Sequence, residues 1–158
     1  SRMYFEKTII FIGKLISLLI PVMTLLMIAI IIARYFFGIG LTGVQELIMY
    51  IHALIFLGCA GFVHLKDEHV RVDIFYRESK DAYKHNTNFI LSFLFLIPVC
   101  FVIGFYSLEL IEMSWKIKEV STEAGGLKFV YVQKSLIILF PVTLMLTFAY
   151  QLLDKKWK

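Results

Sequence analysis

Long apolar stretches alternate with short charged segments along the chain, and four of these stretches are long enough to cross a lipid bilayer. A spanning helix needs about 20 apolar residues, because the hydrocarbon core is about 30 Å thick and each helical residue rises about 1.5 Å. The pattern predicts spans at about residues 15–33, 43–63, 89–108 and 130–153. They occupy most of the chain, so we expect an all-α integral membrane protein with a single membrane domain over residues 1–158.

The third apolar stretch is predicted to continue beyond the bilayer as a helix to about residue 119. No helix breaker follows it until Gly125. On this projection Glu112 and Lys116 have the i, i+4 order that stabilises a helix. Trp115 either packs under the connection that follows or contacts a partner, and the sequence leaves both readings open.

The connection between the second and third stretches has a different pattern, with charges crowded into residues 66–73. As a strand, Val70, Val72 and Ile74 would share one face; as a helix, an apolar stripe would pass through Val72 and Tyr76. A lone strand at a membrane would leave its backbone unpaired, so we predict an interfacial amphipathic helix over about residues 70–83. Side chains expected to anchor the chain at the membrane interface are Lys14, His69, Arg71, Asp73, Phe75, Tyr76, Arg77, Trp115 and Trp157.

Composition agrees with a membrane protein. The 158 residues are 59% hydrophobic and 16% aromatic with a mean hydropathy of +0.80, whereas soluble domains are about 45–50% apolar. The net charge of +4 is unevenly distributed, because 11 of the 16 basic residues fall on the side shared by the two termini and the middle connection. The positive-inside rule therefore predicts cytoplasmic termini. In a chain of this class the positive charge indicates lipid contact, and we expect no nucleic-acid partner.

Two features of the second span bear on packing. Thr42 and Gln45 fit a capping box at its start, and Glu46 in its first turns either complements the helix dipole or makes an interhelical or partner contact. Gly58 and Gly61 form a small-residue surface that another helix could approach closely.

Residue types associated with chemistry are sparse. His52 is the one histidine at membrane depth, and we favour a hydrogen-bonded helix contact over a proton relay. A haem bridging His52 and His64 is excluded, since the two lie roughly 18 Å apart along a helix. The span cores contain no Asp, Glu, Arg or Lys, which are the usual marks of ion pathways. We expect no catalytic residue, no cofactor and no metal in this chain, and no enzymatic activity.

Two segments carry a resemblance to a known family. FLGCAGFVHLKDEHVRVDIFY (residues 56–76) and STEAGGLKFVYVQKSLIILFPV (residues 121–142) resemble the small membrane subunit of tripartite ATP-independent periplasmic (TRAP) transporters, the DctQ or SiaQ family. The run from His69 to Asp73 is its most specific part.

The resemblance implies a partner role in the bacterial inner membrane. In that family a large membrane subunit holds the substrate and sodium sites and moves as an elevator, and a periplasmic substrate-binding protein delivers the substrate. The small subunit is a fixed scaffold. A sialic-acid transporter is favoured, with C4-dicarboxylates as the broader substrate class. Residues expected to contact these partners are Arg34, Glu46, Gly58, Gly61, Glu109, Glu112, Lys116 and Lys118.

Three readings compete at this stage. The first is a non-catalytic subunit of a sodium-coupled transporter. The second is a self-sufficient four-helix exporter, which would need a membrane-embedded carboxylate. The third is a haem-free membrane anchor of a redox complex. The absence of charged residues from the span cores favours the first.

Overall fold

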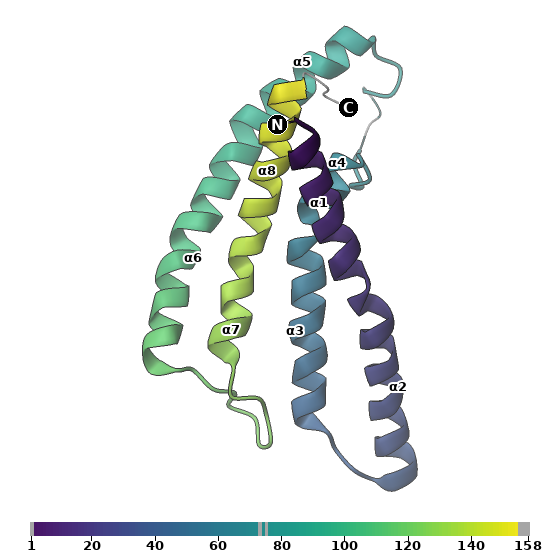
Figure 1. The fold of residues 1–158 in the computed structure, drawn as a ribbon, viewed down its shortest axis with the longest axis vertical. Helices are drawn as coiled ribbons and strands as arrows, with labels where there is room; N and C mark the ends of the chain where they lie inside the picture. Colours follow the sequence, from purple (N-terminus) through teal and green to yellow (C-terminus); the bar gives the residue numbers. More distant parts are fainter. Residues whose placement is uncertain (1, 73, 75, 155–158) are drawn as a thin grey trace.

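The computed structural model describes residues 2–72, 74 and 76–154 and folds them into four rods of helix (Figure 1). Each rod is long and apolar enough to cross a membrane: Met3–Phe37, Thr42–Leu65, Asp81–Ile117 and Val130–Leu153. The described residues contain no strand. The all-α fold with four spans is therefore confirmed. The third rod continues past residue 108 and ends at Ile117.

Each rod consists of two helical segments. The first contains α1 (Arg2–Ser17) and α2 (Leu19–Phe37), and the second contains α3 (Thr42–Gly58) and α4 (Ala60–Leu65). In the third rod a π-helical turn (Ser92–Leu96) joins α5 (Asp81–Leu91) to α6 (Ile97–Ile117). In the fourth a 3₁₀ turn (Leu136–Ile138) joins α7 (Val130–Ser135) to α8 (Leu139–Asp154).

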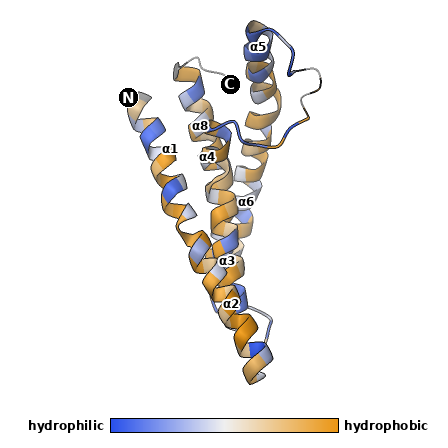
Figure 2. Ribbon diagram, turned by 90° about the vertical axis from the view of Figure 1, so that its right-hand side faces the viewer, coloured by the Kyte–Doolittle hydropathy of each residue, from blue (hydrophilic) through white to orange (hydrophobic). Residues whose placement is uncertain are grey.

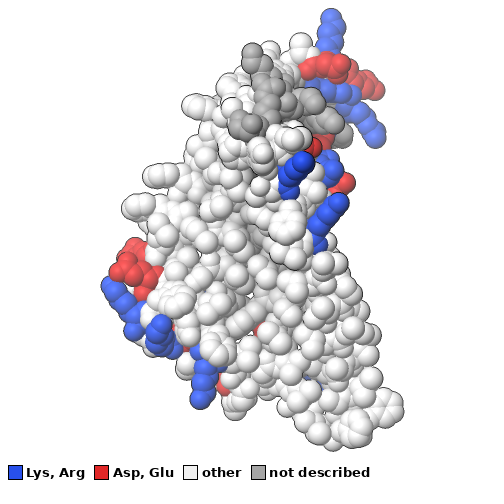
Figure 3. Space-filling view, viewed as in Figure 1, with Lys and Arg blue, Asp and Glu red and all other residues white. Residues whose placement is uncertain are grey.

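The two ends of the bundle differ in what they carry. The N-terminus, the last turns of α8 and the α4–α5 connection lie together at one end, here called the terminal end (Figure 1). The α2–α3 and α6–α7 connections lie at the other, here called the hairpin end. Figure 3 shows Lys, Arg, Asp and Glu gathered towards the two ends, with a broad band free of charge between them. In Figure 2 most of that band is hydrophobic, as a membrane-spanning bundle requires.

All three prolines lie just after an irregularity in a rod. Pro21, Pro98 and Pro141 are the third, second and third residues of α2, α6 and α8. Because proline has no N–H to donate, it cannot bond the carbonyl four residues earlier, and that carbonyl falls in the preceding turn. The α1–α2 break, the π turn and the 3₁₀ turn therefore follow from the prolines. Before Pro21 the irregularity is a break in the helix at Leu18.

The second rod approaches the fourth closely at Gly61. A Cβ built on Gly61 would lie 2.6 Å from the carbonyl carbon of Thr143 and 2.9 Å from its Cβ, so only glycine fits there. The fully buried Thr147 donates its hydroxyl hydrogen to the Gly61 carbonyl at 2.9 Å. Gly58 faces the first rod, where an added Cβ would lie 2.5 Å from Cδ1 at the tip of the Ile16 side chain. The small-residue surface packs against helices of this chain.

Small side chains also bring α6 close to the bundle. Cys100, Ser107 and Ser114 recur every seven residues and are buried, a spacing that keeps them on one face of a helix. Cys100 packs in a core cluster with Ala60 and Leu144. Small residues at such interfaces let backbones approach in the absence of a hydrophobic driving force.

The structure differs from the sequence prediction at the α4–α5 connection. The interfacial helix expected over residues 70–83 does not form: residues 70–72 are irregular, residues 74 and 76–78 lie in turns, and α5 begins at Asp81. The helix is interrupted at Asp67, whose φ of +57° is left-handed. Two side-chain contacts then hold the turn. The Arg71 guanidinium donates to both Asp67 carboxylate oxygens at 2.9 and 3.2 Å, and His69 Nε2 lies 3.2 Å from the Ala60 carbonyl oxygen.

Candidate functional site

The hairpin end carries the densest set of polar contacts in the described chain, and Glu46 is at its centre. Glu46 is placed there by the first turns of α3, and its Oε1 accepts a hydrogen bond from the Ser121 hydroxyl. Its Oε2 accepts one from the Leu127 backbone N–H at 2.6 Å. One carboxylate therefore fixes the connection between α6 and α7, which resolves the open reading of Glu46 in favour of an interhelical contact.

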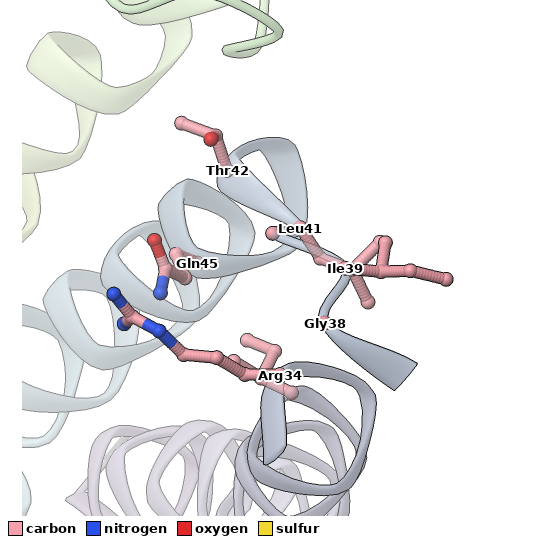
Figure 4. Close-up of a pocket in the computed structure, with 8 residues that line it drawn as sticks. Arg34, Gly38, Ile39, Leu41, Thr42 and Gln45 are labelled. Carbon is pink, nitrogen blue, oxygen red and sulfur yellow. The ribbon is translucent and has the colours of Figure 1, made fainter. Parts of the chain in front are cut away.

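The capping box expected beside Glu46 is not formed. Leu41 is the N-cap residue of α3, and no side chain caps the helix. Thr42 is the first helical residue. Gln45 is exposed and lines a hollow between α2 and α3 (Figure 4).

A second acid, Glu119, lies within the α6–α7 connection just after the end of α6 and secures it. Glu119 Oε2 accepts hydrogen bonds from the Ser114 hydroxyl at 2.6 Å and from the Lys134 ammonium at 2.5 Å. The bonds from Lys134 and then Ser114 lower the pKa of Glu119 below its ordinary value of 4.5. Lys118 makes room for this turn by taking a left-handed conformation, with φ +48°. The sequence prediction missed Glu119 and Lys134 as site residues, because their 15-residue separation crosses a loop and follows no helical spacing.

Trp115 packs against α7, the helix that follows the connection. Its Nε1–H donates to the Ser135 hydroxyl at 2.7 Å, and its ring meets that of Tyr131 edge-on with centroids 4.7 Å apart. The Lys118 ammonium lies 4.4 Å from the Trp115 ring centroid and 5.0 Å from that of Tyr131. The aromatic pair therefore holds a cation at the surface of the hairpin end.

Other residues predicted to contact partners remain exposed. Glu112 and Lys116 form the expected ion pair at 2.7 Å, with side chains 67% and 72% exposed. Glu109 is exposed one turn earlier. Arg34 extends from the last turn of α2 towards Gln45 across a hollow of about 340 Å³ (Figure 4). Gly38 continues the wall of this hollow in a left-handed conformation, with φ +66°.

Side chains at the terminal end hold the charged connection in place. The Tyr76 ring lies between two cations, with Arg71 Cζ at 4.6 Å and Lys84 Nζ at 5.6 Å from its centroid. Asn88 Nδ2 donates to the Tyr76 hydroxyl at 2.6 Å. His69 and Arg71 bond within the chain as described above, while Arg77 and Lys14 are exposed. The predicted anchors Asp73, Phe75 and Trp157 lie outside the described residues.

The whole arrangement is typical of a packed membrane subunit whose hairpin end presents charged and aromatic groups. The chain matches the family model described as tripartite ATP-independent periplasmic transporters, DctQ component, over residues 23–155. The chain belongs to the DctQ family. No curated protein and no solved structure matches it.

Membership of the DctQ family has direct consequences for function. The protein is the small component of a TRAP transporter, a multi-pass inner-membrane protein, and its family is a transporter component and not an enzyme family. A tripartite system implies partnership with a large membrane subunit and a substrate-binding protein.

Proposed function

We propose that this DctQ-family protein is a fixed scaffold for the large, elevator-type membrane subunit of a sodium-coupled importer of organic acids. The large subunit binds the sodium ions and the substrate, and a periplasmic binding protein delivers the substrate. Sialic acid is the favoured substrate, and a C4-dicarboxylate is the next candidate. This preference follows from the resemblance of the whole chain to sialic-acid transporters. This chain performs no catalysis in that scheme.

The observation that carries the scaffold proposal is the hydrogen bonding that joins the second, third and fourth rods at both ends of the bundle. At the hairpin end Glu46 and Glu119 tie the α6–α7 connection to α3 and α7. Towards the terminal end Thr147 and Gly61 hold α8 against α4. Contacts at both ends oppose relative motion of the rods, which suits the stationary partner of a moving subunit.

Loop charge supports an orientation for this scaffold. In the sequence, 11 of the 16 basic residues belong to the two terminal segments and the connection between the second and third spans, so the positive-inside rule directs that side to the cytoplasm. The hairpin end then faces the periplasm. Its exposed charges, Arg34, Glu109, Glu112, Lys116 and Lys118, become the surface available to the substrate-binding protein.

Co-purification and uptake test the proposal together. The tagged chain is expressed together with the large membrane subunit of the same transporter. The complex is then solubilised in detergent and isolated through the tag. We expect the large subunit to co-purify, and proteoliposomes to take up labelled substrate only with both membrane subunits, the binding protein and a sodium gradient.

Three results would contradict the scaffold role. Transport by the purified chain alone in liposomes would establish a self-sufficient carrier. A Soret absorption band in the purified chain would show instead that the chain binds haem. Uptake driven by the large subunit and the binding protein without this chain would also refute the proposal.

A further inference from the structure

His52 presents an unsatisfied polar ring on the outside of the bundle at the middle of the membrane. It lies ten residues into the Thr42–Leu65 rod, about 15 Å along a helix axis, which is half of a hydrocarbon core about 30 Å thick. The ring is exposed and contacts Phe56 of the same helix, with centroids 6.4 Å apart. Among the described residues neither ring nitrogen has a hydrogen-bond partner.

A neutral imidazole has one N–H donor and one nitrogen acceptor. Lipid tails can satisfy neither, so a lipid-facing position at this depth carries the full cost of two unmade hydrogen bonds. Ionisable side chains in membrane helices accordingly face protein or water.

The other exposed faces of the bundle show what a lipid-facing surface looks like in this chain. Between residues 93 and 105 the exposed side chains of the third rod are all apolar, and between residues 139 and 153 those of the fourth rod are apolar as well. Thr24 is exposed on α2, but its hydroxyl donates to the Ile20 carbonyl of its own helix at 3.0 Å. His52 has no such internal partner, so the face of α3 that bears it differs in kind from the lipid-facing ones.

This face continues along α3 as a stripe defined by Gln45, Met49, His52 and Phe56, all of them exposed. Their spacing of four, three and four residues keeps them on one side of a helix. Gln45 lines the hollow it shares with Arg34 and a second hollow on its other side towards Val130 and Gln133. Each hollow has a volume of about 340 Å³, so large side chains of a partner could enter on either side of the stripe.

We infer that the Gln45–Phe56 stripe is the surface on which a transmembrane helix of the large membrane subunit packs, with a hydrogen-bonding group of that helix opposite His52. The flexible Met49 side chain and the Phe56 ring supply apolar contact on either side of this bond. The occupant must lie in the bilayer, because His52 is out of reach of the headgroups and of soluble proteins. This inference rests on the proposed partnership with the large subunit. It adds the surface of this chain at which the two subunits meet.

Site-specific photocrosslinking tests the assignment in the intact membrane complex. A benzophenone amino acid replaces His52, and in a matched control it replaces Phe101, which is 69% exposed on α6. Irradiation is expected to join this chain to the large subunit from position 52 and not from position 101. A crosslink to a second copy of this chain from position 52, or the absence of any protein crosslink there while the complex still co-purifies, would overturn the inference but leave the proposed function intact.

Substitution of His52 distinguishes a hydrogen bond to the large subunit from apolar contact alone. His52→Leu is expected to lower the yield of co-purified large subunit roughly threefold or more, as loss of one interhelical hydrogen bond would do, and His52→Gln to restore part of it. Phe101→Leu serves as the control and leaves the yield unchanged. Equal yields from wild-type, His52→Leu and His52→Gln complexes would refute a hydrogen bond at this position. Loss of the large subunit from every sample, wild type included, would instead count against the partnership itself.

Discussion

Thr147 of α8 donates its hydroxyl hydrogen to the carbonyl oxygen of Gly61 in α4 at 2.9 Å, 86 positions apart in the sequence. The same hydroxyl also lies 3.1 Å from the Thr143 carbonyl oxygen of its own helix. A threonine that would ordinarily bond only its own helix therefore also links two spans. The contact depends on Gly61, because any larger residue would hold the helices apart.

Gly61→Ala is expected to destabilise the bundle. The added methyl group would meet backbone atoms of Thr143, which cannot move aside as a flexible side chain could. Overpacking of this kind costs about 1–3 kcal/mol, or roughly 2–4 °C in Tm per kcal/mol for a chain of this size. Thermal unfolding in detergent measures the effect. Gly104→Ala is the matched control: its Cβ would meet Pro141 at 3.8 Å, an ordinary contact, so its Tm should be unchanged or slightly higher.

Replacing Thr147 isolates the hydrogen bond from the packing. Thr147→Val keeps the shape and removes the hydroxyl, and we expect a loss of about 0.6 kcal/mol with an upper bound near 1.7 kcal/mol, the range for bonds between membrane helices. Thr147→Ser keeps the hydroxyl and should retain most of the bond. A Val variant as stable as wild type would mean that the Gly61 contact contributes only through packing.

Glu46→Ala should free the α6–α7 connection without unfolding the spans. The Leu127 amide loses its bond to a charged acceptor, which typically contributes about 1.5–3 kcal/mol, so its hydrogen exchange should accelerate at least tenfold. Hydrogen exchange followed by mass spectrometry of peptides covering residues 119–129 measures this. Glu109→Ala removes an exposed acid nearby and should leave exchange in these peptides unchanged. Unchanged exchange in the Glu46 variant would contradict the role assigned to this carboxylate.

The Glu119–Lys134 pair predicts a pH dependence of stability. The pKa of Glu119 is lowered in the folded protein, so its contribution is present above the unfolded value of 4.5 and disappears as the pH falls through the folded pKa. Lys134→Gln removes the main cause of the shift. The difference in Tm between wild type and this variant should therefore be largest near neutral pH and vanish in acid. Lys128→Gln, at an exposed lysine of the same connection, is the control, and a Tm difference for Lys134→Gln that persisted unchanged in acid would contradict the assignment.

The four spans could be predicted because length and hydropathy alone decide whether a segment can cross a bilayer. The Glu112–Lys116 ion pair could also be predicted from the sequence, since both residues lie on one helix at a favourable spacing. The prolines explain where the rods are irregular, but whether each irregularity is a break, a π turn or a 3₁₀ turn depends on packing against other helices. A pattern within one segment does not contain that information.

The residues 70–83 show where periodicity misleads. Their apolar spacing fits a helix, yet the left-handed Asp67 ends α4, and the Arg71–Asp67 and Tyr76–Asn88 contacts hold the chain in turns. Glu46 shows the complementary limit. Its two partners are 75 and 81 residues away, so the sequence could suggest a contact but could not say with what.

The π-helical turn at Ser92–Leu96 sets the rotation of α5 relative to α6. Such a turn holds one residue more than an α-helical turn, and one residue corresponds to about 100° around the axis. Deleting a single residue within Ser92–Leu96 would keep the rod continuous but swing Asn88 away from the Tyr76 hydroxyl it bonds. The orientation of the α4–α5 connection therefore depends on the number of residues in the π-helical turn, although that turn comes later in the chain. The number of residues in the turn is as constrained as their types.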